Sequence, residues 1–183
     1  MIRTCLAVVV AATIAFTWGW GSWSLFGWHQ PQAFENSDAV VEVLMANSPT
    51  HGMYAHPRWD PNLDPAEHEA RWKEGPHIYA MVRPDPAPGL SMQGAMIKGF
   101  LINILAATAL VLLIQKSGHS SFLDRTSMAL LAGLFLGIVS ALNPWNWLES
   151  PGLHTIGVLA DGIIPWTIAG AAIAMILPAG DPV

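Results

Sequence analysis

The sequence predicts an all-α membrane protein: a four-transmembrane-helix bundle with a small α/β extracytoplasmic layer between its first and second helices. Apolar residues make up 52% of the 183 residues and charged residues only 11%, well below the roughly one quarter that is typical of soluble domains. The apolar residues gather in long runs, each near the ~20 residues that a helix needs to cross the hydrocarbon core. The predicted spans are 6–26, 95–114, 126–142 and 155–177.

These spans divide the chain into four predicted parts. They are the first transmembrane helix at 1–28, the extracytoplasmic layer at 29–94, transmembrane helices two to four at 95–178, and a cytoplasmic tail at 179–183. The layer carries nine of the thirteen carboxylates and four of the eight basic residues. An excess of acid disfavours nucleic acid as a partner, whereas the apolar spans imply a lipid bilayer.

The orientation is predicted from the lysines and arginines of the short segments. Arg3, Lys116 and Arg125 would lie on one side of the membrane, whereas the segment 143–154 on the other side has neither lysine nor arginine. Because basic short loops stay in the cytoplasm, we expect the N- and C-termini inside a bacterial inner (cytoplasmic) membrane. Tryptophans favour membrane interfaces, and six of them fall near the expected outer ends of the helices: Trp18, Trp20, Trp23, Trp28, Trp145 and Trp147.

The extracytoplasmic layer is predicted to contain two short helices and two extended runs. The first helix covers 38–46, with Asn36 or Ser37 as its N-cap. The second follows the Asp-Pro pair at 64–65, since an acid before a proline is a typical helix start. The extended runs, which could pair as an antiparallel ribbon, are 52–56 and 77–82.

Two spans carry small residues at every fourth position. Small residues at this spacing allow helix backbones to approach closely in lipid. The stripes could pack within the bundle, or one of them could dock on a partner protein. The predicted packing residues are Ala7, Ala11, Ala15 and Gly19 in the first span and Ala129, Gly133, Gly137 and Ala141 in the third.

Asp161 is the leading candidate for a functional residue, because it is the only acid well inside a predicted span and an unpaired charge there is costly. His154 precedes it by seven residues and therefore shares its helix face. The pair could serve a proton or cation path from the outer surface. Alternatively, Asp161 could be a structural residue that pairs with Asn103 of the second span, or with Trp145 or Trp147 before the last span.

Pro165 follows Asp161 by four residues. A proline inside a helix has no backbone N–H to donate, so we expect a bend there that frees the carbonyl of Asp161.

No catalytic residue, cofactor or metal ion is assigned from the sequence. His51, His56 and His77 of the outer layer are weak metal candidates, because their side chains are suitable ligands but no pair has the spacing of a known site. The serines, the single cysteine and the histidines form no nucleophile motif, and no glycine-rich phosphate loop is present.

The order of motifs is similar to that of a group of uncharacterised bacterial four-span inner-membrane proteins. The resemblance depends on the Trp-His pair at 28–29, the segments 34–36 and 48–54, and a Pro-Trp-Asn-Trp turn at 144–147 followed by the Asp-bearing last helix. It would cover nearly the whole chain. It implies an architecture and no named function.

The function expected from the sequence is that of an accessory or scaffold subunit in a larger inner-membrane complex, respiratory or photosynthetic, with other membrane-protein subunits as partners. The expectation comes from the small-residue stripes and the tryptophan-rich outer rim. One alternative is a small transporter or membrane enzyme that uses Asp161 with His154. Another is a membrane-anchored periplasmic metal-handling module. An enzyme is the less favoured class, because no catalytic signature is complete.

Overall fold

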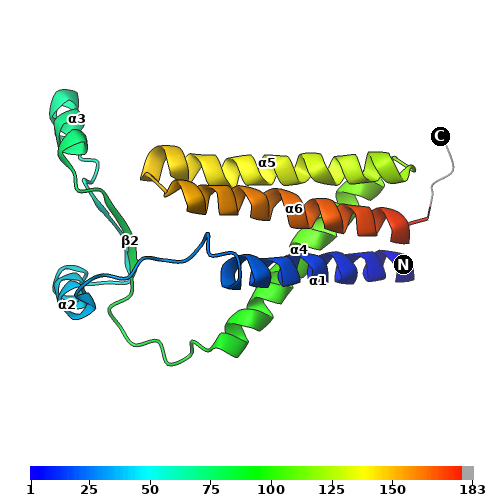
Figure 1. Ribbon diagram of the computed structural model, residues 1–183, viewed down its shortest axis with the longest axis horizontal. Coiled ribbons are helices and arrows are strands. Elements are labelled where there is room, and N and C mark those ends of the chain that lie inside the picture. Colours follow the sequence, from blue (N-terminus) through cyan, green and yellow to red (C-terminus); the bar gives the residue numbers. More distant parts are fainter. Residues whose placement is uncertain (179–183) are drawn as a thin grey trace. The chain divides into compact units, whose positions relative to one another are not determined.

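The structure, a computed structural model, describes residues 1–178 and is mostly helical (Figure 1). The predicted cytoplasmic tail at 179–183 lies outside the described residues. The described residues divide into two compact units, which we call the helical bundle (residues 1–30 and 90–178) and the loop domain (residues 31–89). Four helices of the bundle are long and apolar enough to cross a membrane: α1 (Ile2–Ser24), α4 (Met92–Lys116), α5 (Phe122–Leu148) and α6 (Gly152–Ile176).

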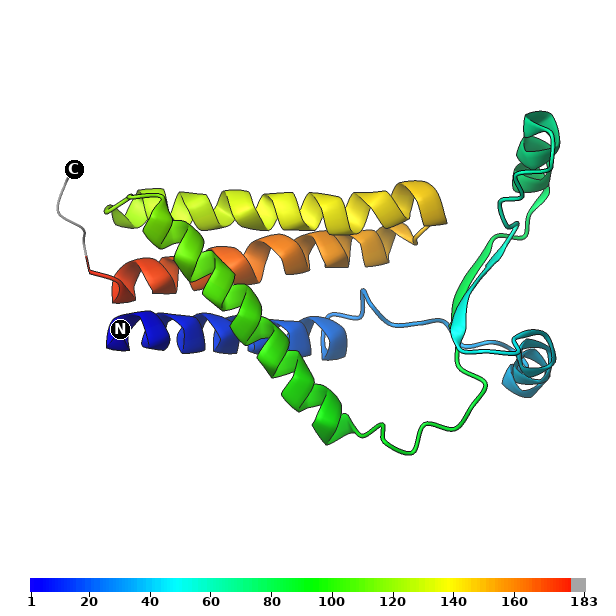
Figure 2. The ribbon, with the colours of Figure 1, turned by 180° about the vertical axis from the view of Figure 1, so that it is seen from behind.

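Within the bundle, α1, α5 and α6 run alongside one another and α4 crosses them obliquely (Figures 1 and 2). The end of α4 meets the start of α1, where Gln115 Nε2 donates to Thr4 Oγ1 at 3.2 Å. The start of α5 meets the end of α6, where the Arg125 guanidinium donates to the carbonyls of Leu177 and Pro178 at 3.1 and 2.8 Å. Successive helices therefore alternate in direction, as a four-span chain requires.

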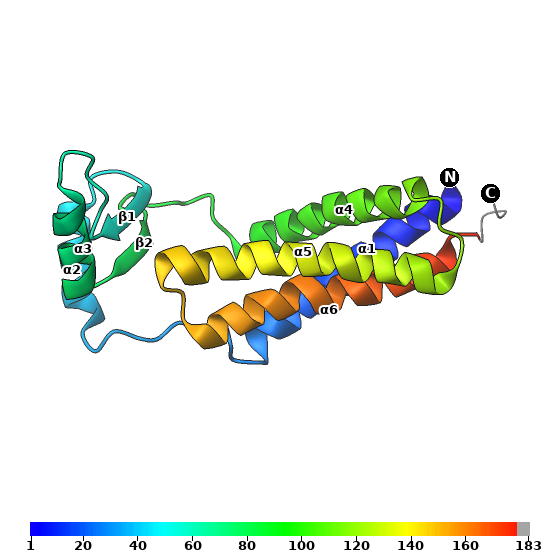
Figure 3. The ribbon, with the colours of Figure 1, turned by 90° about the horizontal axis from the view of Figure 1, so that it is seen from above.

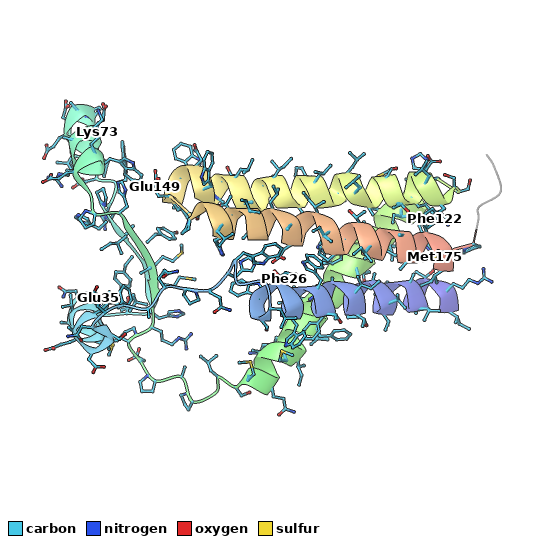
Figure 4. All side chains as sticks on the ribbon, in the orientation of Figure 1. Phe26, Glu35, Lys73, Phe122, Glu149 and Met175 are labelled. Carbon is cyan, nitrogen blue, oxygen red and sulfur yellow. The ribbon has the colours of Figure 1, made fainter. Side chains whose placement is uncertain are left out.

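The outward faces of these helices are apolar. Large side chains such as Leu105 and Phe135 are more than two thirds exposed, and Figure 4 shows Phe122 and Met175 near one end of the bundle. Exposure of such apolar surfaces to water is unfavourable on helices of this length, whereas contact with lipid is favourable. The bundle therefore suits a bilayer environment as a multi-pass membrane protein.

The helices are longer than the predicted spans, and the largest difference is at the end of α5. The segment 144–147, predicted as a turn, is helical through Leu148. Proline removes only one backbone hydrogen bond and is tolerated inside membrane helices. The chain reverses instead at Glu149, which has a left-handed φ of 54°. The turn prediction was therefore wrong, and His154 belongs to the first turn of α6 rather than preceding the span.

The two small-residue stripes pack inside the bundle. Ala129, Gly133, Gly137 and Ala141 are all buried. Helices α5 and α6 lie side by side (Figure 3), and their backbones are in close contact at the stripe, since a Cβ atom built on Gly162 would lie only 2.4 Å from the Gly137 Cα. In α1, Ala7, Ala11 and Ala15 are buried. Gly19, predicted to pack in the same stripe, does not, because a Cβ atom at this position would meet no atom within 4 Å. Small residues thus bring helix backbones into direct contact.

The loop domain contains two short helices and a two-stranded sheet. Strands β1 (Gly52–His56) and β2 (Ile78–Val82) pair antiparallel, with Tyr54 opposite Ala80. Helix α2 (Ser37–Asn47) is capped by Asn36, whose side chain accepts from the Ala39 N–H. Helix α3 (Pro65–Glu74) is capped in the same way by Asp64. Both helices and the strand pairing agree with the sequence prediction.

Candidate functional site

Asp161 has three hydrogen-bond partners at the centre of the candidate site. Trp18 Nε1 donates to Oδ1 at 2.9 Å, and the Ser22 hydroxyl donates to the same oxygen at 2.6 Å. His29 Nε2 lies 3.1 Å from Oδ2. An ionised carboxylate only accepts hydrogen bonds, so three converging donors are the arrangement that stabilises a negative charge in an apolar bundle.

His29 connects Asp161 to His154. Its Nδ1 lies 3.0 Å from His154 Nδ1, while its Nε2 contacts Asp161. The His29 side chain is fully buried, whereas His154, in the first turn of α6, is partly exposed. The series His154, His29, Asp161 therefore leads from the helix end to a carboxylate about 10 Å further along α6, at 1.5 Å per residue.

The segment after α1 returns to the bundle and places His29. Gly27 has a φ of 73°, a left-handed conformation that glycine adopts easily. Phe26, labelled in Figure 4, packs edge-on against Trp18 and Trp28, with ring centroids 5.7 and 5.0 Å away. Trp28 Nε1 also donates to the Ser22 hydroxyl at 2.8 Å. The reversal thus holds Trp28 and the following histidine against the last turns of α1.

Two neighbours hold the His29 ring in place. Trp23 stacks on it, with ring centroids 4.4 Å apart and an interplanar angle of 12°. Gly157 faces it from α6, and a Cβ atom at this position would lie 2.8 Å from both His29 Cε1 and Trp28 Cδ1. The absence of a side chain at Gly157 is therefore what allows the histidine to reach Asp161.

A pocket of about 780 Å³ opens beside Asp161. Its walls come from the second half of α1, the first half of α4 and the middle of α6. Phe16 and Phe100 contact edge-on with centroids 5.5 Å apart, where α1 and α4 meet. The Asp161 side chain is 24% exposed. The carboxylate therefore faces a space large enough for a small molecule.

Ser22, His29 and Asp161 do not form a hydrolytic triad. In a triad the two nitrogens of the histidine contact the serine and the acid separately, whereas here His29 Nε2 contacts both, at 3.1 Å each. The serine is also fully buried, and its hydroxyl donates a hydrogen bond to Asp161. The geometry suits charge stabilisation and proton transfer, not nucleophilic attack.

The structural partners expected for Asp161 were wrong. Asn103 lines the same pocket but donates its side-chain amide to the Gly99 carbonyl. Trp145 and Trp147 are 54% and 69% exposed near the end of α5, whereas the side chains that contact the carboxylate are Trp18, Ser22 and His29. Asp161 and His154 do belong to one hydrogen-bonded series, but through His29 rather than directly.

Sequence reasoning missed Trp18, Ser22, Trp28 and His29. The tryptophans were assigned only to an aromatic rim, and His29 was placed outside the spans. One signal was available: Ser22 follows Trp18 by one helical turn, so two hydrogen-bond donors share a face near the end of an otherwise apolar helix.

The three weak metal candidates, His51, His56 and His77, are three of the four histidines in the loop domain. His77 Nε2 is 2.7 Å from the Trp72 carbonyl, and His51 Nδ1 is 3.4 Å from the Arg83 guanidinium; His56 ends β1. Within residues 1–178, no group of three His, Cys, Asp or Glu side chains is arranged to hold a metal ion.

A second pocket of about 550 Å³ lies in the loop domain, lined by charged side chains that include Asp60. Hydrogen bonds from the backbone and side chain of Asn62 lower the pKa of Asp60. The Asp60 carboxylate therefore stabilises the turn at residues 60–62 by accepting these hydrogen bonds.

Comparison with family models, with curated proteins and with solved structures finds no match to this chain. The fold and the site must therefore be interpreted from their own geometry. Together they define a multi-span helical membrane protein with a hydrogen-bonded carboxylate and two histidines inside its bundle.

Proposed function

We propose that this chain is a small proton-coupled membrane transporter. Asp161 exchanges a proton with one end of the bundle through His29 and His154, and the pocket beside Asp161 holds the transported solute. The observation that carries this proposal is the continuous series of short contacts, 3.0 Å between the two histidines and 3.1 Å from His29 to Asp161. Histidine is the side chain best suited to accept and release protons near neutral pH.

The coupling between proton binding and cation binding follows from the position of Asp161. A carboxylate inside an apolar bundle is stable when it is paired with a positive group or protonated. A cation in the pocket and a proton on Asp161 therefore compete for the same oxygen atoms. Arrival of a proton through the histidines releases the cation, and departure of the proton favours its binding.

The test is proton movement through reconstituted protein. The wild-type chain is placed in liposomes that contain a pH-sensitive dye and a mixture of alkali and small organic cations that can exchange for the proton, and a pH gradient is imposed. We expect the gradient to collapse faster than in empty liposomes, and His29→Gln to remove the difference, because glutamine can form hydrogen bonds but cannot relay a proton. His119→Gln is the matched control, since this histidine lies in the loop before α5. Equal rates for the wild type and His29→Gln would contradict the proposal.

A second proposed function is the accessory or scaffold subunit of a larger inner-membrane complex. The observation in its favour is the exposure of Trp145 and Trp147 near the end of α5, since large exposed aromatic side chains suit protein contacts as well as lipid interfaces. The small-residue stripes no longer support it, because α5 uses its stripe against α6. Purification in mild detergent tests it: a partner that co-purifies with the wild type and is lost with Trp147→Ser favours this function.

A further inference from the structure

We infer that the pocket beside Asp161 binds a hydrophobic protonated amine. This inference rests on the proposed transport function and adds the chemical class of its substrate. It follows from three features of the pocket: the unused hydrogen-bonding capacity of the carboxylate, the aromatic walls, and the charge of the lining residues.

The Asp161 carboxylate has one acceptor position left for a ligand. An ionised carboxylate offers about four lone-pair sites. Oδ1 accepts from Trp18 and Ser22, whereas Oδ2 contacts only His29 Nε2. The remaining position is on Oδ2, and the partly exposed side chain lines the pocket. A protonated amine can donate an N–H to that oxygen and form a charge-assisted hydrogen bond.

The walls of the pocket suit an organic cation. Aromatic rings attract cations over their faces, and tryptophan does so most strongly. Among the described residues that line the pocket there is no lysine or arginine, and Asp161 is the single charged side chain. The remaining polar side chains are few, so most of the wall is apolar. The aromatic lining residues are Phe16, Trp18, Trp20, Trp23 and Trp166.

Other ligand classes fit the pocket less well. An anion would be repelled by Asp161. A bare metal cation needs several oxygen ligands, whereas Asp161 is the only carboxylate in the lining. A purely apolar molecule would cover the carboxylate without pairing it, which is costly. A volume of about 780 Å³ is within the range of pockets that hold small organic molecules.

The experiment compares three ligands of nearly equal shape. They are benzyldimethylamine, which is protonated at pH 7 and has an N–H; benzyltrimethylammonium, which is charged without an N–H; and neopentylbenzene, which is neutral. Binding to the purified full chain in detergent is measured by equilibrium dialysis against empty micelles. We expect the amine to bind about tenfold more tightly than the trimethylammonium ion, and the neutral compound most weakly.

Two variants assign the binding to this pocket. Asp161→Asn should abolish the preference for the amine, whereas Asp85→Asn, the same change at an exposed site in the loop domain, should leave it intact. If Asp161→Asn does not fold, Trp20→Ala serves instead, because Trp20 is 55% exposed and its loss should disturb the fold little. This variant should weaken the binding of both cations more than the binding of the neutral compound.

Equal affinities for the amine and the neutral compound in the wild type, or an unchanged preference in the folded Asp161→Asn protein, would overturn the assignment. The measurement involves no proton movement across a membrane. Failure of amine binding with intact proton flux would therefore refute the substrate class alone, whereas amine binding without proton flux would refute the transport function.

Discussion

His29 Nδ1 lies 3.0 Å from His154 Nδ1, and a hydrogen bond between two imidazole nitrogens requires a proton on one of them. When His154 carries a proton on both ring nitrogens, its Nδ1–H donates to Nδ1 of a neutral His29, which keeps its Nε2–H for Asp161. With the proton on His29, that ring is a cation beside the carboxylate. The two states differ by one proton transfer, so this contact is the step at which the bundle end and the buried acid exchange charge.

His154→Gln should block this step without disturbing the fold. The amide can still donate to His29 Nδ1, but it cannot pass a proton on. Proton flux through reconstituted protein should fall by about a hundredfold or more, the lower end of the usual contribution of a positioned proton-transfer group. Thermal stability should stay near that of the wild type, because His154 is only partly buried. A folded variant with full flux would remove His154 from the path.

Gly157→Ala tests the position of the His29 ring without removing any ionisable group. The new methyl group would lie 2.8 Å from both His29 Cε1 and Trp28 Cδ1, so the segment after α1 must move away from α6. We expect reduced proton flux with His29, His154 and Asp161 all present. Gly152→Ala is the control, because no atom lies within 4 Å of a Cβ at Gly152. Equal effects of the two substitutions would show that this close contact does not matter.

Gly137→Leu should separate α5 from α6. The first side-chain carbon alone would lie 2.9 Å from the Leu159 carbonyl oxygen, and overpacking of this kind typically costs about 1–3 kcal/mol or more. Thermal unfolding in detergent measures the loss. Gly21→Leu, on α1 where a Cβ meets no atom within 4 Å, should unfold within a few degrees of the wild type. Stability of Gly137→Leu equal to that of Gly21→Leu would contradict the observed packing.

The helices and the small sheet could be predicted because their signals are local. Long apolar runs mark the spans, and Asp64 followed by proline marks the start of α3. The end of α5 could not be predicted in the same way. Pro144 resembles a helix breaker in the sequence, but the helix continues past it and ends at Glu149.

The site was predicted in part, because Asp161 and His154 share one helix face. The connecting residue was not predicted, since His29 is distant from both in sequence and reaches them through a reversal at Gly27. Such a contact depends on how α1 packs on α6. Spacing along one helix contains no information about it.

The orientation in the membrane is a further prediction. Lys116 and Arg125 lie near the bundle end at which α1 starts, and short basic segments stay in the cytoplasm; Lys98, near the start of α4, is the exception. In a Cys5→Ser background, a cysteine at His119 should react with a membrane-impermeant thiol reagent from the cytoplasmic side. A cysteine at Asn62 should react from the outer side. Reaction of both positions from one side would contradict the four-span topology.

Asp161→Asn and Asp161→Leu separate a transport role from a structural one. Asparagine keeps the shape of the side chain and can still accept from Trp18 and Ser22, but it carries no charge and binds no proton. Leucine also removes the acceptors: the Trp18 N–H loses its partner, while the Ser22 hydroxyl and His29 Nε2 can then donate only to each other, and a buried group left unsatisfied costs about 1–3 kcal/mol. We therefore expect Asn to fold with lost proton flux, and Leu to lower the unfolding temperature as well. Unfolding temperature and flux are measured side by side for the two variants. If Asn retains wild-type flux while Leu unfolds, Asp161 serves only to hold α1 against α6, and the transport proposal fails.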